Sequence, residues 1–523
     1  MGNKDAVFTD YISTRQVAGR RNPHGKDYQV REIFLPIFLF LIIAGLFVKT
    51  FWVQIVRGDY YRALSDSNRI RTIPIHAPRG VVLDRNGKPL VYNIAGFRQT
   101  VNGKTKILTS DEALSLIAQG KKDLEVDNLR SYPYKEMFSH VLGYIGQISP
   151  EELKLPEFSD YTGTDLVGKI GIEDEYEPVL KGIDGKELVE VNSMGEAVRK
   201  LGSTDPIPGE NISVNLDLNV QKAAFSAMGG VKKGTAIVST PKGEILAMVS
   251  KPSFDPNFFT LGATYKASTT SGYQKLSKIL LDNSSQPLLD RAVSGTYPPG
   301  STFKLVVATS GLQNKIIDEN YSVDDTGKIN VGEFSFANWY FTQYGKTDGE
   351  VDVIKGIKRS NDVFFYKLGE KIGVDKISAT GAEFGLGKKL GVDLNGEATG
   401  LLPTQVWKKK VIGEPWYLGD TYHYSIGQGY LLTTPLQVNT WTQVLSSRGD
   451  LYRPHLLKNR ELNKPLKTDL VNEKTLSLIR QGMIESCAPG GVAWPFFEFS
   501  VKNPKLNIDG KNYIEATKTT TSA

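Results

Sequence analysis

The sequence contains very little cysteine and histidine. Its single cysteine, Cys487, excludes a disulfide within the chain and provides no metal-binding motif. The histidines are scattered and show no short spacing typical of a metal site; they are His24, His76, His140, His423 and His455. We therefore expect neither a metal nor a cofactor, and we interpret Cys487 as a small packed residue near a helix end.

Clusters of basic residues and internal repeats are also absent. The formal net charge is +6, but lysine and arginine are spread along the 523 residues. We interpret these charges as a solvated surface and expect no nucleic-acid partner. A chain of this length with 40% hydrophobic residues is expected to be globular and to hold more than one domain.

One hydrophobic run near the N-terminus, from Ile33 to Val48, stands out. As a helix its 16 residues would span about 24 Å, which is short for a bilayer. If Lys49 snorkels, the run extends to Val53 and reaches about 31 Å, with Trp52 at an interface. No cleavage site of small residues follows, so an uncleaved anchor is favoured over a signal peptide. A buried core helix is the alternative.

The charges flanking this run indicate its orientation. Residues 13–32 contain five lysines and arginines, whereas residues 49–68 contain three. Lysine and arginine favour the cytoplasmic side of a membrane helix. We therefore expect a cytoplasmic N-terminus, with the bulk of the chain outside.

The stretch from Tyr297 to Lys304, YPPGSTFK, carries the strongest chemical signal. Two prolines and a glycine precede Ser301, and an apolar run follows from Phe303, which predicts a loop that leads into a buried helix. Residues three apart share a helix face, so Lys304 should lie beside Ser301. Desolvation and the helix N-terminus would both favour an uncharged lysine. A neutral amine beside a hydroxyl can take its proton and activate a serine nucleophile.

A second Ser-x-x-Lys pair, Ser239 and Lys242, has a different context. It falls between two strand-like runs, residues 234–240 and 244–250, across the turn Pro241-Lys242-Gly243. No helix would align the two side chains there, so we predict a β-hairpin turn rather than a catalytic pair.

Other local signals predict structure rather than chemistry. Asn86-Gly87 predicts a tight turn between two strands, across which Arg79 and Asp84 could pair. Asp217 is expected to cap a helix. The triplet Ser360-Asn361-Asp362 lies between two expected helices, and from these residues alone we interpret it as a helix cap.

Several stretches resemble a known family when taken together, in this order and behind one anchor helix. They are Arg79-Gly80, Asp84-Arg85-Asn86-Gly87, Gly168-Lys169-Ile170-Gly171-Ile172-Glu173, Pro287-Leu288-Leu289-Asp290-Arg291-Ala292, Tyr297 to Lys304, and Ser425-Ile426-Gly427-Gln428-Gly429-Tyr430. The chain resembles class B penicillin-binding proteins over roughly residues 40–520, and within them the elongation-type penicillin-binding protein 2.

The resemblance implies an α+β fold in three parts. A single N-terminal transmembrane helix precedes a β-rich pedestal domain of the dimerisation type. A serine transpeptidase or β-lactamase-like domain follows, with an antiparallel sheet and a helical subdomain. We expect a cytoplasmic tail at 1–32, the anchor at 33–53, the non-catalytic pedestal at 54–205, and the transpeptidase domain at 206–523.

The same resemblance implies an enzyme of the cytoplasmic membrane, facing outward, that crosslinks peptidoglycan stem peptides. Ser301 would attack the D-Ala–D-Ala carbonyl and release D-alanine, and an amine of a neighbouring stem would take the acyl group. Ser360 would relay a proton to the departing amine, and Asp362 would orient Lys304 and the substrate. β-Lactams would acylate the same serine. The partners implied are the membrane, a SEDS-type glycan polymerase and elongation-complex proteins.

The third family motif, Lys-Thr-Gly on a strand, aligns with Lys518-Thr519-Thr520. Lys518 and Thr519 would bind the substrate carboxylate, and the amide of Thr521 would join that of Ser301 in an oxyanion hole. Thr520 departs from the pattern, since glycine there allows backbone to approach backbone. Family members also continue past Ala523 with strands and a C-terminal helix. We therefore expect either a truncated chain or decayed catalysis.

Two alternatives to the transpeptidase remain at this level. The substitution at Thr520 and the early end suggest a non-catalytic cell-wall scaffold that uses the pedestal at 54–205. A serine β-lactamase or carboxypeptidase shares the Ser-x-x-Lys chemistry. The long module before the catalytic stretch and the uncleaved anchor argue against this last alternative.

Overall fold

The structure of the chain is a computed structural model. It describes residues 28–101, 104–108, 110–121, 124–192, 197–262, 265–267, 272–495, 507–508 and 511–512. The chain divides into two compact units. The first comprises Met1–Ile73 with Glu187–Ser203, and the second comprises Pro74–Lys186 with Thr204–Ala523.

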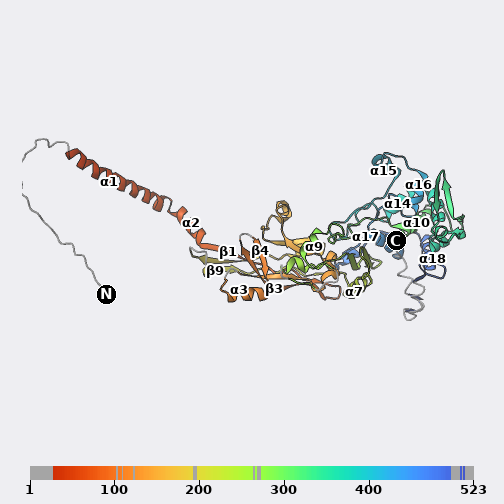
Figure 1. Cartoon of the computed structure of the whole chain (residues 1–523), viewed down its shortest axis with the longest axis horizontal. Coiled ribbons are helices and arrows are strands. Elements are labelled where there is room, and N and C mark those ends of the chain that lie inside the picture. Colours follow the sequence, from red (N-terminus) through yellow and green to blue (C-terminus); the bar gives the residue numbers. More distant parts are fainter. Residues whose placement is uncertain are drawn as a thin grey trace, which may run out of the picture. The chain divides into compact units, whose positions relative to one another are not determined.

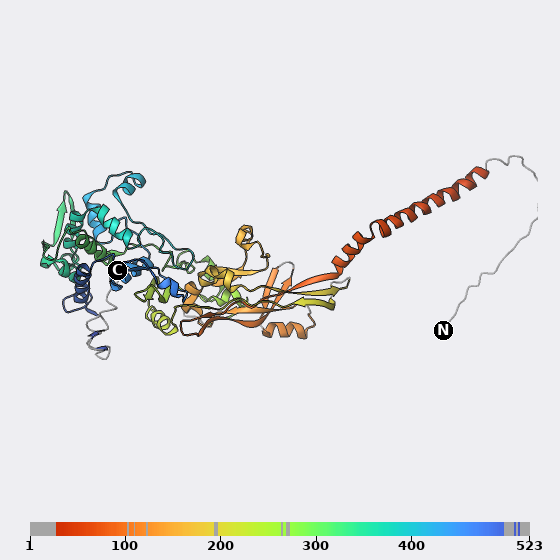
Figure 2. The same ribbon diagram turned by 180° about the vertical axis from the view of Figure 1, so that it is seen from behind.

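The first unit begins with the apolar helix α1 (Tyr28–Phe51), a π-helical turn η1 (Trp52–Val56) and α2 (Gly58–Arg69). Figure 2 shows α1 and α2 as successive red helical ribbons. Within them, Phe34–Val56 is long and apolar enough to cross a membrane. This span overlaps the anchor expected at 33–53 and extends a little further along the chain.

A three-stranded sheet completes this unit. Its order is β1 (Ile70–Ile75), β8 (Gly185–Val191) and β9 (Ala197–Thr204). On β8, Glu190 forms ion pairs with Arg69 and Arg199. Both arginine side chains are mostly exposed, so these pairs contribute little to stability.

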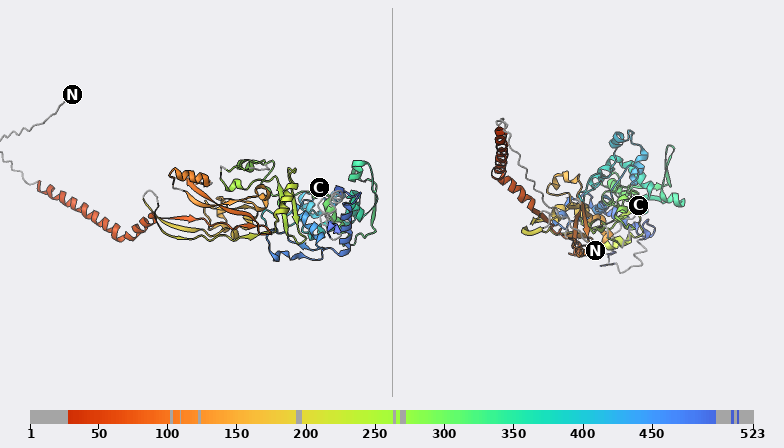
Figure 3. Two further views of the ribbon diagram at one scale, coloured as in Figure 1. Left: turned by 90° about the horizontal axis from the view of Figure 1, so that it is seen from below. Right: turned by 60° about the vertical axis from the view of Figure 1, so that its left-hand side comes forward.

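The second unit opens with a mostly antiparallel sheet. Its strands are β2 (Val82–Leu83), β3 (Pro89–Val101), β4 (Lys104–Leu108), β5 (Glu125–Ser131) and β10 (Ile212–Ser213). The order is β10-β2-β3-β4, and β5 pairs with the earlier part of β3. The orange strands of this sheet run side by side in Figure 1 and in the left panel of Figure 3.

Short helices and one hairpin accompany this sheet along the chain. They are α3 (Ser110–Ala118), η2 (Lys135–Phe138), α4 (Ser139–Leu142), β6 (Tyr144–Gln147), η3 (Glu152–Lys154), η4 (Pro156–Phe158), β7 (Leu166–Ile170), α5 (Gly171–Glu175) and α6 (Glu177–Leu180). The β6–β7 pair is antiparallel, and α5 follows directly on β7. The helix α3 packs against β3.

The predicted tight turn at Asn86-Gly87 is confirmed between β2 and β3. Gly87 has φ of +81°, which glycine adopts without a steric penalty. The Asp84 carboxylate accepts the backbone N–H groups of Asn86 and Lys88, both at 2.8 Å. The expected pair between Arg79 and Asp84 is wrong, because each side chain has other partners. Asp84 is engaged within its own turn.

Arg79 instead joins a buried cluster of ion pairs. It lies 3.0 Å from Glu173 and 2.7 Å from Glu177, while Arg130 lies 2.6 Å from the other oxygen of Glu173. Arg130 and Glu173 have no exposed side-chain surface. Burial alone would raise the pKa of Glu173, but Arg130 and Arg79 hold that pKa below its usual value. The cluster ties β5 and the segment before β2 to α5 and α6.

The later part of the unit contains the second predicted hairpin. It is confirmed as β11 (Gly234–Ser239) paired antiparallel with β12 (Ile245–Lys251). The predicted cap is also confirmed: Asp217 accepts the N–H groups of Asn219 and Val220 at the start of α7 (Leu218–Ala227).

Helices dominate the rest of the chain. They are α8 (Asn257–Thr260), α9 (Leu276–Leu281), η5 (Gly300–Phe303), α10 (Lys304–Gln313), α11 (Trp339–Tyr344), α12 (Val353–Arg359), α13 (Asp362–Ile372), α14 (Val374–Glu383), α15 (Gln405–Val411), α16 (Leu418–Ser425), α17 (Pro435–Ser446), η6 (Arg460–Asn463) and α18 (Glu473–Ser486). Short antiparallel strand pairs accompany them: β13 (Ser322–Asp325) with β16 (Gly349–Asp352), β14 (Lys328–Val331) with β15 (Phe334–Ala337), β17 (Leu451–Tyr452) with β18 (Pro465–Lys467), and β19 (Asn507–Ile508) with β20 (Lys511–Asn512).

The helix α10 lies at the centre of this helical part. It packs against α13, α14 and α18, and every residue from Lys304 to Leu312 is buried. The core around it includes Phe303, Phe364 and Trp441, all with no exposed surface. Each such side chain contributes about 1.5–3 kcal/mol of hydrophobic stabilisation. The start of α10 is therefore held in a rigid frame.

The buried cluster gives a stability prediction. Replacing Glu173 with glutamine keeps the shape of the side chain but removes the charge between Arg79 and Arg130. We expect Glu173→Gln to lower the free energy of unfolding by about 3–5 kcal/mol, because it leaves the buried cation of Arg130 without a counter-charge and Arg79 with Glu177 alone. Urea unfolding of the full chain in detergent measures this. The control Glu461→Gln, at an exposed pair with Lys464, should change it by less than about 1 kcal/mol. Equal effects of the two variants would contradict the prediction.

Candidate active site

The chain enters α10 through a clamped turn that carries Ser301. Gly300 donates its N–H to the carbonyl of Gly427 over 2.9 Å, and Tyr297 and Thr433 exchange two backbone hydrogen bonds. Gly427 has φ of +77°, and a Cβ there would lie 2.1 Å from the Gly300 oxygen, so only glycine fits. Residues of the Ser-Ile-Gly-Gln-Gly stretch therefore support the serine turn. Ser301 itself is exposed.

Lys304 begins α10 and lies in the interior. Only 2% of its surface is exposed, and its Nζ donates to three oxygens: the Ser360 carbonyl at 2.8 Å, Ser360 Oγ at 3.0 Å and Asp362 Oδ1 at 2.6 Å. The ring of Phe365 lies 5.4 Å away. Burial lowers the pKa of the lysine, and its effect outweighs the opposing effect of Asp362. At a given pH, a larger fraction of Lys304 is therefore uncharged than of an ordinary lysine.

Ser360 lies between α12 and α13 in an uncommon backbone conformation. Its φ of +49° falls in the left-handed region, which non-glycine residues adopt at an energetic cost. In this conformation both its carbonyl oxygen and its hydroxyl lie within 3.0 Å of Lys304 Nζ. The neighbouring Asn361 caps α13 through the N–H of Phe364. The helix-cap interpretation of the triplet is thus confirmed for Asn361, while its flanking residues contact the lysine.

The structure brings Lys304, Ser360 and Asp362 into direct contact and places Ser301 on the turn immediately before the lysine. Lys304 and the Ser360 hydroxyl, 3.0 Å apart, can exchange a proton. Ser301 lies one turn earlier, and among the described residues the Lys304 amine donates to Ser360 and Asp362 and not to the Ser301 hydroxyl. The predicted residues of the third motif, Lys518, Thr519, Thr520 and Thr521, lie outside the described residues.

The second Ser-x-x-Lys pair has the structural role expected of it. Ser239 ends β11, and its hydroxyl donates to Asn439 Oδ1 over 2.8 Å. Lys242 lies exposed in the turn that follows. The two side chains are not aligned on a helix, so only the pair at α10 has the predicted context.

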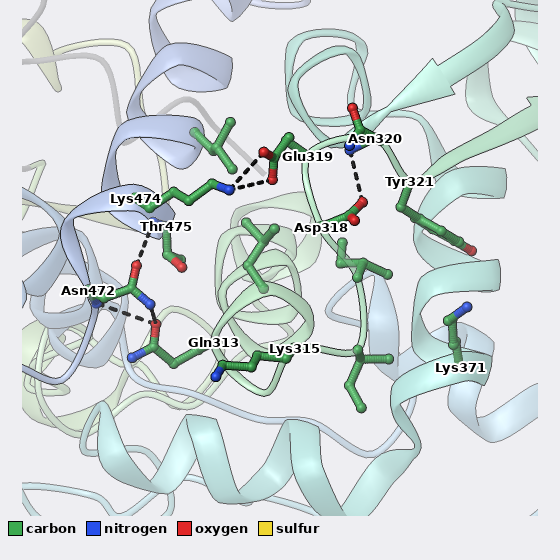
Figure 4. A pocket seen from close by; sticks show the side chains of 14 residues that line it. Gln313, Lys315, Asp318, Glu319, Asn320, Tyr321, Lys371, Asn472, Lys474 and Thr475 are labelled. Atoms are coloured by element: carbon green, nitrogen blue, oxygen red, sulfur yellow. Dashed lines mark hydrogen bonds and ion pairs between the residues drawn. The ribbon is translucent and has the colours of Figure 1, made fainter.

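A cavity of about 620 Å³ lies at the opposite, C-terminal end of α10 (Figure 4). An ion pair between Lys474 and Glu319 spans 2.7 Å on its wall, and Gln313 accepts from Asn472. Of the predicted catalytic residues, Ser301, Lys304, Ser360 and Asp362 lie within the described part of the chain, and none of these four lines the cavity. Within the part of the chain that the structure describes, no group of three or more His, Cys, Asp or Glu side chains is placed to hold a metal.

Two residues that contact Asp362 could not be found from the sequence. Trp339 donates its backbone N–H to Asp362 Oδ2 over 2.9 Å, and Asn338 accepts the backbone N–H of Asp362 over 3.2 Å. They precede Asp362 by 23 and 24 residues and belong to no recognisable spacing. These two contacts depend on the tertiary structure, which brings the segment before α11 next to Asp362.

Comparisons with protein families agree with this geometry. Residues 234–511 match the family model described as penicillin binding protein transpeptidase domain. Residues 110–214 match the one described as penicillin-binding protein dimerisation domain. The two models cover the segment that carries the serine site and the segment that contains strands β5 to β10.

Curated relatives and solved structures point the same way. The peptidoglycan D,D-transpeptidase MrdA of Acinetobacter baumannii is 32% identical, over 92% of this chain and 79% of that protein. The MrdA of Escherichia coli K12 is also 32% identical, over 82% of this chain and 74% of its own length.

Among solved structures, penicillin-binding protein 2 (PBP2) of Helicobacter pylori in complex with MreC matches with a TM-score of 0.69 and 30% identity, over 82% of this chain and 86% of that one. Pseudomonas aeruginosa PBP2 in complex with WCK 5153 matches with a TM-score of 0.64 and 33% identity, over 82% and 83%. The chain therefore belongs to the class B penicillin-binding proteins of the PBP2 type, a family of serine D,D-transpeptidases.

Proposed function

We propose that this D,D-transpeptidase crosslinks peptidoglycan stem peptides through an acyl-enzyme on Ser301. The observation that supports the proposal is the buried amine of Lys304, one turn along from an exposed serine and in contact with Ser360 and Asp362. A buried lysine whose pKa is lowered fits the role of a general base.

The acylation step begins with the neutral form of Lys304. Its two N–H groups satisfy Ser360 and Asp362, which leaves the nitrogen lone pair free for the Ser301 proton. Ser301 Oγ then attacks the carbonyl carbon of the D-Ala–D-Ala bond and forms a tetrahedral intermediate. As the carbon–nitrogen bond breaks, Ser360 gives its proton to the departing D-alanine amine. Lys304 returns a proton to Ser360 over their 3.0 Å contact.

The second half of the cycle reverses the proton path. The amine of a neighbouring stem attacks the acyl-enzyme and loses its proton through Ser360 to Lys304. Ser301 leaves and takes a proton back from the lysine. By resemblance to the family, Lys518 and Thr519 bind the substrate carboxylate, and the amides of Ser301 and Thr521 bind the oxyanion. Thr520 lies within this same motif.

The transpeptidase function is better supported than a non-catalytic scaffold. A decayed site has no need of a buried lysine, whose desolvation is costly. In this chain the lysine is retained together with Ser360 and Asp362. The dimerisation-type and transpeptidase regions occur in one chain, which also disfavours a free-standing β-lactamase.

The chain is anchored to the membrane by the span Phe34–Val56. We place its N-terminus on the cytoplasmic side and the catalytic domain outside, because lysine and arginine are more frequent before the span than after it. We also propose domains at 54–205 and 206–523. We propose elongation-complex proteins and a SEDS-type glycan polymerase as partners. The relative solved with MreC supports the former, and a similar structure described as a peptidoglycan synthase complex that coordinates polymerization and crosslinking supports a polymerase partner.

If Ser301 forms the acyl-enzyme, covalent labelling by a penicillin should depend on this residue. A fluorescent penicillin should label the wild-type chain, and Ser301→Ala should abolish the label because the attacking oxygen is gone. Ser239→Ala is the matched control, since it changes the other Ser-x-x-Lys pair, and it should be labelled normally. Labelled Ser301→Ala protein on a denaturing gel would refute the assignment.

The lowered pKa of Lys304 predicts the pH dependence of acylation. The rate should rise with pH as the lysine loses its proton, along a limb centred below the ordinary lysine value of about 10.5. Asp362 favours the charged lysine, so Asp362→Asn should move this limb to lower pH by about 1–3 units.

Acylation rate constants for a fluorescent penicillin, measured between pH 5 and 10, test this prediction. Asp318→Asn is a matched control, because Asp318 is exposed and contacts Asn320 near the far end of α10. This control should leave the limb in place. A shift of the Asp362→Asn limb to higher pH would contradict the proposed role of the lysine.

A further inference from the structure

Asp362 is held by a segment that lies outside the stretches Tyr297–Lys304, Ser360–Asp362 and Lys518–Thr520. Its Oδ2 accepts the backbone N–H of Trp339 at 2.9 Å, and its own N–H donates to Asn338 Oδ1 at 3.2 Å. Both contacts come from the start of α11, directly after the β14–β15 hairpin. They leave Asp362 Oδ1 facing Lys304.

Asn338 is in turn fixed by a buried carboxylate. Its side chain has no exposed surface, and its Nδ2 donates to Asp325 Oδ2 over 2.8 Å. Asp325 is 2% exposed, and the same oxygen accepts from Asn361 Nδ2 at 2.8 Å and from the backbone of Asp348 at 3.0 Å. Both ends of the Asn338 amide are therefore used, one toward Asp325 and one toward Asp362. A buried network in which every contact is made fixes its members in one arrangement.

A second path closes the network into a ring. Asn361 also donates to Asp348 Oδ2 at 3.1 Å, and Arg359 donates to the other oxygen of Asp348 at 2.9 Å. The carbonyl of Arg359 accepts from the indole N–H of Trp339 at 3.0 Å. Asn361 and Asp362 are thus tied to three residues of the β13–α11 segment, namely Asp325, Asn338 and Trp339. The position of Asp362 therefore depends on its direct contacts with Asn338 and Trp339 and on the contacts that hold its neighbour Asn361.

We propose that Asn338, oriented by Asp325, is a positioning residue for acyl transfer that holds Asp362 against Lys304. This inference rests on the proposed roles of Ser301 and Lys304. Asn338 touches neither the serine nor the lysine, and it acts only through Asp362. Removing its amide would loosen the carboxylate, and with it the placement of the base.

The electrostatic consequence has a definite sign. Among the described residues, Asp362 on α13 is the charged group that faces the amine of Lys304; Asp325, Asp348 and Arg359 lie behind it, in contact with one another or with Asn361. If Asp362 moves away, the charged lysine loses its counter-charge and its pKa falls further. The acylation limb should then move to lower pH. A role limited to packing would lower stability without moving that limb.

The experiment uses the full chain and a fluorescent penicillin. Asn338→Leu has a similar size but no amide, and Asp325→Asn removes the charge that orients it. We expect each to lower the limiting acylation rate by about 10- to 100-fold, as a small misplacement of a catalytic group does. The pH midpoint should fall by roughly 0.5–1 unit, less than for complete loss of the Asp362 charge. Asn330→Leu, at an exposed residue of β14, is the matched control and should resemble wild type.

The outcomes separate the two proposals. If the wild type is not labelled at Ser301, the proposed function fails. If the wild type is labelled, and a folded Asn338→Leu protein keeps both its rate and its midpoint, the positioning role is overturned. The same holds if only its melting temperature falls. Should Asn338→Leu not fold, Asp325→Asn decides by the same two readouts.

Discussion

The structure depends on keeping an amine inside an apolar helical bundle. Lys304 begins α10, and the residues that follow it as far as Leu312 are buried. Without partners, a buried ammonium would cost several kcal/mol. The Asp362 carboxylate and two oxygens of Ser360 offset this cost, and desolvation still lowers the pKa of the lysine. The amine is therefore stable in the fold yet ready to accept a proton.

The site keeps the base away from water and leaves the nucleophile accessible to substrate. Ser301 is exposed on a turn that backbone contacts with Gly427 and Thr433 hold in place, whereas Lys304 is closed in by α12 and α13. Because the serine turn and the lysine are consecutive in the chain, one rigid element positions both. Substrate can therefore approach the nucleophile without hydrating the base, which would raise the pKa of the lysine toward its usual value.

The features predicted correctly from the sequence are those that depend on residues close together in the chain. The cap at Asp217, the turn at Asn86-Gly87 and the loop at Ser360 are each determined by residues within one turn of the chain, and the structure shows all three. The partners of Arg79 were missed because Glu173 and Glu177 lie 94 and 98 residues away. Pairing between residues so far apart in the sequence depends on the tertiary fold, so no residue spacing in the sequence indicates it. The contacts of Asn338 with Asp325 and Asp362 are hidden in the same way.

The chemistry of Asp362 explains why an aspartate stands at the third position of the Ser-x-x triplet. Both groups that face its side chain, the amine of Lys304 and the backbone N–H of Trp339, are donors. A carboxylate offers acceptors to both, whereas an asparagine would direct its own N–H₂ at one of them. Its neighbour Asn361 shows the converse, since its amide accepts from Phe364 and donates to Asp325. The identities of Asn361 and Asp362 thus follow from whether their partners donate or accept.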